Sequence, residues 1–417
     1  MTLSSSRSEH RSFWRAPLVI LICGCLIGML SFGPRSTFGF FLAPMDAAHG
    51  WGRDQFGLAL AIEMLLWGAG QPFSGALADR FGAPLVLAAG ALLYVVGIVW
   101  MAFAQSPFEL YMSAGVLIGF GLAGCSFTLV IAAFAKLLPP HWRTVAFGAG
   151  TAAGSFGQFL FSPLAVALID NVGWQNALLT FAVILLVVLP LAFVLSAPPH
   201  ARPDSSSAVV PGQSVRQALM EAFGHRSYVL LTLGYFTCGF QLFFITVHLP
   251  AYLIDRGLPA SIGGWTIAVI GLFNIVGSVA SGYIANLMPK RFLLSAIYFS
   301  RSLAILVFIT LPPSPTTTLI FGAALGLLWL STIPPTSALV AIMFGSRWLT
   351  MLLGVSFFSH QVGGFLGVWL GGVLFERTGS YDVIWWATIF LGVASAVINL
   401  PIVERPVSRP AAAATPA

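Results

Sequence analysis

The sequence contains few charged residues. Asp, Glu, Lys and Arg make up 8% of its 417 residues, and its mean hydropathy is +0.92. A soluble globular domain carries about 25% charged residues, so this composition excludes an ordinary soluble enzyme or binding module. Hydrophobic residues reach 58% and aromatic residues 13%, which is typical of a protein that spans a membrane.

Motifs that carry catalysis are also missing. The chain has no Gly-x-Ser-x-Gly and no Gly-x-x-x-x-Gly-Lys, so it lacks the sequence signals for a nucleophile elbow and for a phosphate-binding loop. Its four cysteines lie in apolar runs without the spacing of metal ligands. We therefore expect no enzyme activity, no cofactor and no metal site.

Long apolar runs account for most of the chain. A membrane-spanning helix needs about 20 mostly apolar residues, and twelve runs meet that length. They cover residues 17–43, 54–78, 84–104, 108–137, 143–169, 174–196, 227–253, 261–288, 291–311, 316–343, 348–375 and 383–403. The sequence therefore predicts an all-α membrane protein with twelve transmembrane helices.

The basic residues predict how the chain crosses the membrane. With the N-terminus inside, fourteen Lys and Arg residues fall on the inner side and three, Arg53, Arg256 and Arg377, fall outside. This excess follows the positive-inside rule, so the net charge of +6 reports topology and does not indicate a nucleic-acid partner. Residues 1–16 contain no cleavage site before the first apolar run, and we interpret them and residues 404–417 as cytoplasmic tails.

The chain divides into two related halves. Residues 197–226 form the one long polar segment, which we interpret as a flexible cytoplasmic linker between the six-helix bundles 17–196 and 227–403. A basic turn recurs in each half, after Gly75 and after Gly282, as two pseudo-symmetric six-helix bundles predict.

Several stretches resemble a known transporter family. The turn Gly75-Ala-Leu-Ala-Asp79-Arg80-Phe-Gly82 resembles the loop between the second and third helices of the major facilitator superfamily. Within it, three stretches look like the monocarboxylate transporters and their bacterial relatives, including the oxalate/formate antiporters. These are Pro34-Arg35 with the following Phe40-Phe41, the run from Gly119 through Lys136 and Arg143 to Gly173-Trp174, and Ser359-His360-Gln361 through Tyr381-Asp382.

The resemblance implies the major facilitator fold and transport by alternating access. One position departs from the family pattern. Characterised members hold an Asp and an Arg one turn apart in the eighth helix, whereas this chain has Asn274 and Ser278 there. Proton coupling and carboxylate binding through that pair therefore do not carry over.

Arg35 and Glu63 are the main candidates for chemistry inside the bilayer. An ionisable group at mid-helix costs about 3 kcal/mol on insertion scales. Arg35 matches the family's substrate-contacting cation, and its guanidinium suits a carboxylate. Glu63 lies at similar depth on the neighbouring helix, where it would either exchange protons as the substrate takes Arg35 or form a permanent structural pair with it.

Other polar residues in the apolar runs are weaker candidates. His248, Asn274 and Gln361 would help Arg35 to bind the substrate, and His360 would relay a proton; for each histidine, a hydrogen-bonded packing role is the alternative. Arg301 would line the inner vestibule or snorkel to the membrane surface.

The remaining candidates concern conformational change. Gly75, Asp79, Arg80 and Gly82 would form a gating turn, with Asp79 latching the two bundles together in the outward-open state; a plain turn with a solvated ion pair is the alternative. Pro334-Pro335 would break the tenth helix.

Together these features predict a secondary transporter of a small organic anion, with a monocarboxylate favoured, by proton symport. The alternatives are a carboxylate anion exchanger and a proton-coupled exporter of apolar drugs, the latter suited by the aromatic content. A sensor that binds a ligand without moving it is a further alternative of another class. The expected partners are the anion, a proton and the lipid bilayer, without nucleic acid. We expect a monomeric, multi-pass protein of the plasma (inner) membrane.

Overall fold

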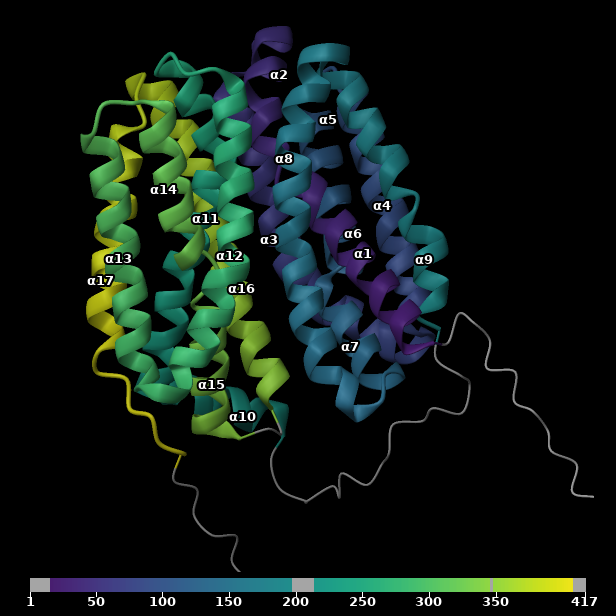
Figure 1. Ribbon diagram of the computed structural model, residues 1–417, viewed down its shortest axis with the longest axis vertical. Helices are drawn as coiled ribbons and strands as arrows, with labels where there is room; N and C mark the ends of the chain where they lie inside the picture. Colours follow the sequence, from purple (N-terminus) through teal and green to yellow (C-terminus); the bar gives the residue numbers. More distant parts are fainter. Residues whose placement is uncertain (1–15, 197–213, 346–347, 408–417) are drawn as a thin grey trace, which may run out of the picture.

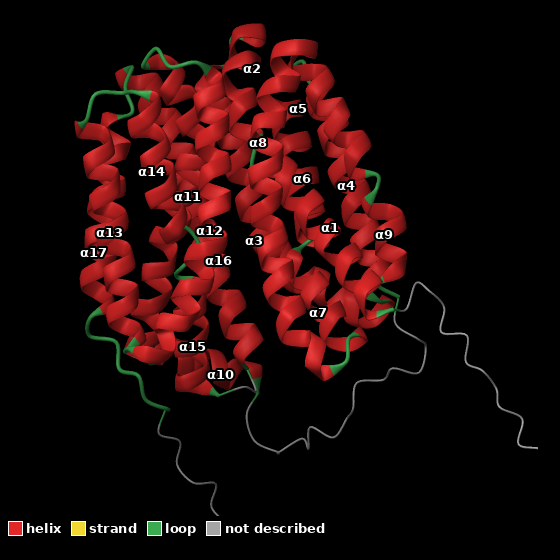
Figure 2. Ribbon diagram, viewed as in Figure 1, coloured by secondary structure: helices red, strands yellow, loops and turns green. Residues whose placement is uncertain are grey.

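The computed structural model describes residues 16–196, 214–345 and 348–407, and all regular elements in these ranges are helical (Figures 1 and 2). The first half contains α1 (Pro17–Arg35), η2 (Phe38–Phe41), α2 (Leu42–His49), α3 (Gly52–Phe81), α4 (Ala83–Phe103), α5 (Pro107–Leu110), η3 (Tyr111–Leu117), α6 (Ile118–Gly124), α7 (Phe127–Leu137), α8 (Pro140–Leu185) and α9 (Val188–Val194). The second half contains α10 (Val215–Gly224), α11 (Arg226–Asp255), α12 (Ala260–Leu287), α13 (Lys290–Thr310), α14 (Pro315–Leu328), α15 (Ile333–Phe344), α16 (Leu349–Thr378) and α17 (Asp382–Asn399).

These elements make twelve membrane crossings. In the described ranges, 11 helical stretches are long and apolar enough to cross a membrane. One of them, His141–Val194, runs for 54 residues and turns at Gly173, where φ is 82°. A positive φ of this size suits glycine and interrupts the helix, so this stretch supplies two crossings. The predicted all-α fold with twelve helices is confirmed.

Four crossings are broken near their middle. In the first, the α-helix ends at Arg35 and η2 follows; the fourth breaks between Gly124 and Phe127, and the sixth between Leu185 and Val188. The tenth breaks between Leu328 and Ile333, as Pro334-Pro335 predicted, because proline has no N–H to donate to the preceding turn. Broken helices expose backbone groups inside the bundle, where side chains must satisfy them.

The predicted linker is partly helical. Ser214 and Gln217 form a capping box that starts α10, and such a cap stabilises the first turn of a helix. The interpretation of all of 197–226 as flexible was therefore incomplete, because it overlooked this capping signal. Residues 197–213 lie outside the described residues.

The helices form two bundles that stand side by side, α1–α9 and α11–α17 (Figure 1). They meet along two long seams, α3 against α16 and α8 against α12. The end of the molecule at which α9 ends and α10 begins is called the linker end below, and the other is called the opposite end.

Glycines bring the backbones close along α16. Within the second bundle, a Cβ added to Gly239 would collide with the carbonyl of His360, and one added to Gly363 with that of Phe236. Between the bundles, a Cβ on Gly57 would lie 3.1 Å from the carbonyl oxygen of Val368. Small residues of this kind allow close helix packing in membranes. Helix α16 is therefore packed backbone to backbone against α11 of its own bundle and closely against α3 of the other.

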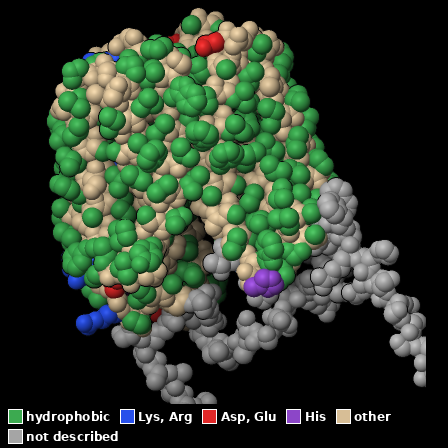
Figure 3. All heavy atoms as spheres, in the orientation of Figure 1, with side chains coloured by type: hydrophobic (Ala, Val, Ile, Leu, Met, Phe, Trp, Pro, Cys, Tyr) green, Lys and Arg blue, Asp and Glu red, His purple; other side chains and the backbone are tan. Residues whose placement is uncertain are grey.

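The two bundles are closed at the opposite end and separate at the linker end. In the described ranges, the hydrogen bonds between bundles join α3, between Arg53 and Met64, with α11, with α16 and with Tyr381 just before α17. Two more join Ser155 and Gln158 of α8 with α12. Figure 3 shows the surface hollowed between the bundles toward the linker end. The structure is thus a state with a cleft open at the linker end.

Candidate functional site

An ion pair is buried where the first helix breaks. Arg35 is the last residue of α1, and its Nε donates to Oε1 of Glu63 on α3 over 3.1 Å. The two side chains are only 3% and 0% exposed. The sequence suggested this contact from equal depth on neighbouring helices, and the structure confirms that the two side chains touch.

The rest of the Arg35 guanidinium has no charged partner among the described residues. Its Nη2 lies 2.8 Å from Sδ of Met64, and a thioether is a weak acceptor. Its carbon lies 4.4 Å from the ring centre of Phe243 on α11. In the described part of the chain, Glu63 Oε2 and the hydroxyl of Tyr94 are buried without a hydrogen-bond partner, and the two groups lie within electrostatic range of each other. The pair therefore holds unused hydrogen-bonding capacity on both sides.

An aromatic cluster lies beside the pair. We use this term for Trp67 (α3), Phe243 (α11), Phe357 and His360 (α16). The Trp67 ring centre is 5.9 Å from that of Phe357 and 6.5 Å from that of Phe243, with steeply inclined planes. His360 lies 5.4 Å from Phe243. Edge-to-face contacts of this kind are attractive, and here they join the two bundles.

Gln361 and His360, two of the predicted residues, lie in this region, and Gln361 bonds the backbone of α3. Gln361 Nε2 donates to the carbonyl oxygen of Met64 over 3.1 Å, and its Oε1 lies 3.0 Å from His360 Nδ1. Both side chains are buried. Arg35, Glu63, His360 and Gln361 therefore belong to one site at the meeting point of the bundles.

Asn274 serves a different place. Its Nδ2 donates to Ser155 Oγ of the other bundle over 2.8 Å, and its Oδ1 accepts from the backbone N–H of Leu330 over 2.9 Å. Leu330 lies in the break of the tenth helix. Asn274 therefore satisfies the broken backbone and joins α12 to α8. Ser278, which stands at the other position of the Asp–Arg pair found in characterised family members, donates to the same Oδ1.

Arg301 neither lines a vestibule nor snorkels, so both expectations for it were wrong. Its side chain is fully buried. Nη2 donates to the carbonyl oxygens of Leu328 and Trp329, and Nη1 to Gln241 Oε1. The guanidinium binds the free carbonyls at the end of α14, where the helix dipole is negative. Nothing in the sequence indicated that the carbonyls left free by the broken tenth helix would bind this arginine inside the bundle.

A second cross-bundle cluster, which the sequence did not predict, closes the opposite end. We call Arg53, Asp255, Glu376 and Tyr381 the latch. Arg53 makes two hydrogen bonds to the Asp255 carboxylate, of 2.6 and 2.8 Å, and its backbone N–H donates to Glu376 over 2.8 Å. Burial raises the pKa of Tyr381, so its phenol stays protonated. The signal in the sequence was the charged residues at the ends of the second, seventh and eleventh helices.

His248 lies behind the latch and not beside Arg35. Its Nδ1 is 3.1 Å from the Tyr381 hydroxyl, and its Nε2 is 2.8 Å from the carbonyl oxygen of Val368. The ring is fully buried. A doubly hydrogen-bonded packing role, the alternative weighed for this residue, fits these contacts.

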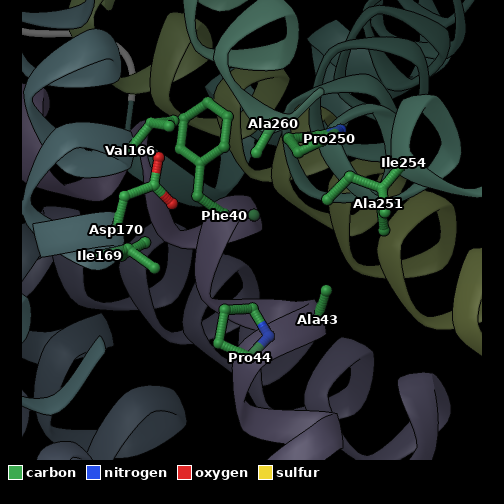
Figure 4. Close-up of a pocket in the computed structure, with 11 residues that line it drawn as sticks. Phe40, Ala43, Pro44, Val166, Ile169, Asp170, Pro250, Ala251, Ile254 and Ala260 are labelled. Carbon is green, nitrogen blue, oxygen red and sulfur yellow. The ribbon is translucent and has the colours of Figure 1, made fainter. Parts of the chain in front are cut away.

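Near the opposite end, a small cavity of about 170 Å³ lies between the bundles. Figure 4 shows it lined by apolar side chains, among them Phe40, Pro44 and Pro250, with Asp170 at its side. It is formed by α2, α8, α11 and their neighbours, and the latch lies at the same end of the bundles. The cavity therefore belongs to the closed entrance and not to the Arg35 site.

Two bundles, with a buried ion pair in the first that faces α11 of the second, agree with the comparison to known families. The model of the Major Facilitator Superfamily matches residues 24–367. The chain belongs to this superfamily. It is therefore a multi-pass membrane transporter and not an enzyme.

Similar proteins support the narrower resemblance. The transporter is 29% identical over 407 residues to the uncharacterized MFS-type transporter YcxA of Bacillus subtilis (strain 168), covering 96% of this chain and 97% of that one. It is 27% identical to monocarboxylate transporter 13 of Rattus norvegicus, covering 89% and 86%. The distant resemblance to monocarboxylate transporters is confirmed.

Solved structures share the fold. A D-xylose-proton symporter matches with a TM-score of 0.71 at 16% identity, covering 94% of this chain and 98% of that one. A bacterial homolog of the human lysosomal transporter Spinster matches with a TM-score of 0.73 at 15% identity, covering 91% and 95%. At this level of identity the likeness extends to the fold alone.

The superfamily turn lies at the linker end of α3. Asp79 Oδ1 is 2.9 Å from Nζ of Lys136 on α7, and both side chains are exposed. Gly82 has a φ of 91°, which favours glycine between α3 and α4. Space is open in front of Gly75, and Arg80 is exposed beside Phe81. The observed ion pair of the transporter joins helices of one bundle, so the latching role of Asp79 stays a prediction.

Proposed function

We propose that the transporter moves a small organic anion, a monocarboxylate, together with a proton by alternating access. The observation that carries this proposal is the Arg35–Glu63 pair, buried where the two bundles meet. A substrate carboxylate that binds Arg35 replaces Glu63 as its partner. Glu63 then takes up a proton, because an unpaired carboxylate is strongly disfavoured at such a buried place.

The other site residues fit this proposal in different ways. Gln361 and His360 lie close enough to orient the bound anion or to pass a proton. Asn274 and His248 act through conformation, since their hydrogen bonds hold the broken tenth helix and the closed opposite end. The monocarboxylate class also draws support from the printed names of relatives such as monocarboxylate transporter 13.

The proposed orientation places the linker end in the cytoplasm of the plasma (inner) membrane. The excess of basic residues in the tails, the linker and the loops at that end supports it. In this orientation the structure is an inward-open state, and a monomer contains the complete site.

Binding to purified protein tests the substrate class. We expect short carboxylates to raise the melting temperature of the wild type and to have no effect on Arg35→Ala or on Arg35→Gln, which retains polar volume at the site. If apolar cations or drugs stabilise the protein while carboxylates do not, the anion proposal is wrong and the exporter alternative replaces it.

Glu63→Gln distinguishes proton symport from anion exchange. The amide keeps the shape of the side chain but cannot take up a proton. We expect accumulation driven by a pH gradient to fall at least tenfold in proteoliposomes, whereas counterflow of labelled substrate continues. Uptake that still follows the pH gradient in this variant would remove Glu63 from the mechanism.

Asp79→Asn tests the proposed gating turn. The Asp79–Lys136 pair is exposed, and exposed ion pairs contribute only about 0.2–1 kcal/mol to stability. We therefore expect the melting temperature of Asp79→Asn to stay close to that of the wild type. If Asp79 latches the bundles in the outward-open state, transport should nevertheless fall severalfold. Lys136→Gln is the matched control. Normal transport in Asp79→Asn would contradict the latching role and would support the alternative, a plain turn with a solvated ion pair.

A further inference from the structure

The described contacts of Arg35 leave one edge of its guanidinium available. Nε is paired with Glu63 and Nη2 touches a thioether, whereas Nη1 has no hydrogen-bond partner among the described residues. The flat face of the group lies over Phe243 at 4.4 Å, with Trp67 at 5.7 Å. An incoming carboxylate would bind this Nη1–Nη2 edge before it displaces Glu63 from Nε, and it would therefore have aromatic rings directly beside it.

Trp67 has an unused donor at the same place. Its Nε1 is buried and, among the described residues, has no hydrogen-bond acceptor. A buried indole N–H normally finds one. The missing acceptor points to a ligand atom, since the neighbouring rings of Phe243 and Phe357 offer no oxygen or nitrogen.

The aromatic cluster also lies at the inner limit of the cleft. Trp67, Gln71 and Gly75 follow one another at intervals of four residues and so share one face of α3. Space is open in front of Gly75, Gln71 is partly exposed and bonds Thr128 of α7, and Trp67 is partly exposed above them. Phe357 is partly exposed on α16. A molecule that moves along this face from the linker end reaches the cluster together with Arg35.

The two arginines deep in the described membrane helices, Arg35 and Arg301, fit a substrate with one carboxylate and not with two. Arg301, the other arginine deep in the membrane helices that the structure describes, is fully buried and binds the carbonyls of α14. A second carboxylate on the substrate would therefore find no free cation comparable to Arg35. The body of the substrate meets rings instead of charges.

We propose that the substrate is an aryl monocarboxylate, whose acid group binds Arg35 and whose ring packs into the aromatic cluster. This inference rests on the proposed function and narrows its substrate class. A carboxylate of two or three carbons would leave the Trp67 and Phe357 rings without contact. An aromatic ring would bury its faces there and gain edge-to-face contacts.

The test compares four probes on the purified full chain by thermal shift and by calorimetric titration: benzoate, cyclohexanecarboxylate, lactate and the neutral benzamide. We expect benzoate to bind at least tenfold more tightly than lactate, and more tightly than cyclohexanecarboxylate, with no binding of benzamide. Trp67→Leu should reduce the ratio of benzoate affinity to lactate affinity to less than threefold, while lactate still binds. Phe357→Leu should act in the same direction, which keeps the test valid if one variant fails to fold.

Trp100→Leu is the matched control, because Trp100 is exposed on α4, and it should keep the wild-type ratio. Lactate binding equal to benzoate, cyclohexanecarboxylate equal to benzoate, or an unchanged ratio in both cluster variants would overturn the aryl class. In the first two cases, loss of binding in Arg35→Gln would still support a carboxylate carrier. If no carboxylate binds in an Arg35-dependent way, the proposed function itself fails.

Discussion

Arg35→Ala is expected to destabilise the protein by about 3–5 kcal/mol, in addition to abolishing substrate binding. Removing one partner of a buried ion pair leaves the other charge without compensation, and losses of this size are typical. Glu63 is fully buried and its Oε2 already has no partner among the described residues. In Arg35→Ala it would therefore take up a proton, and the cost of that protonation at neutral pH is part of the lost stability.

The melting temperature of purified variants measures this effect, and a double variant isolates its cause. In Arg35→Met with Glu63→Gln, both charges are gone and the volumes are similar, so most of the lost stability should return while transport stays absent. Arg80→Ala, at an exposed arginine of the same bundle, is the control and should melt as the wild type does. A double variant as unstable as Arg35→Ala would show that Arg35 stabilises the fold by packing rather than by charge.

Arg53→Ala is expected to open the opposite end. In the closed state, Arg53 forms a two-point hydrogen bond to Asp255 and lies 3.8 Å from the Phe375 ring centre. A partly buried pair of this kind contributes about 1 kcal/mol, and a cation–π contact about 1 kcal/mol more. These partners lie on the other bundle, so the contacts are lost when the bundles separate. Losing about 2 kcal/mol shifts the equilibrium about 30-fold toward the state that is open at this end.

Labelling of a reporter cysteine measures this shift. Val247 is buried on α11 next to Gly39 of the first bundle, so Val247→Cys in a variant without the four native cysteines reports on opening. A membrane-impermeant maleimide should label it at least tenfold faster in Arg53→Ala. The control is Arg256→Ala, because Arg256 stacks on Tyr252 of its own helix. Equal labelling rates in the two variants would show that the latch does not hold the end closed.

Most of the fold could be predicted from the sequence because a bilayer imposes a simple rule. Each crossing needs one apolar run of fixed length, and the twelve predicted runs coincide with the observed crossings. The breaks were harder to predict. Pro334-Pro335 predicted the one in the tenth helix, and Pro34, inside α1 beside Arg35, was a comparable signal for the break in the first helix that went unused. Helix α10 was missed although Ser214 and Gln217 carry its capping box.

The site was predicted less evenly. The pairing of Arg35 with Glu63 could be suggested but not established, because helices of known direction fix only the depth of each residue. The partners of His248 and Arg301 could not be predicted, because they depend on the rotation of each helix about its axis and on which backbone groups a break leaves free. The composition of α13 does not show how the helix is rotated. Arg301 points into the bundle because the carbonyl oxygens of Leu328 and Trp329, at the end of α14, accept its hydrogen bonds.

The glycines on both sides of α16 also bear on how fast the transporter changes state. Toward α11, the backbones interlock so closely that these two helices must move as one body. Toward α3, a Cβ on Gly372 would collide with the carbonyl oxygen of Arg53, and one on Gly57 would lie 3.1 Å from that of Val368, so the closed end also depends on backbone contact. These contacts between the bundles must separate each time the opposite end opens, whereas the contacts with α11 need not. We therefore expect a larger residue at Gly372 to disfavour the closed end and so to change the rate at which the bundles rock.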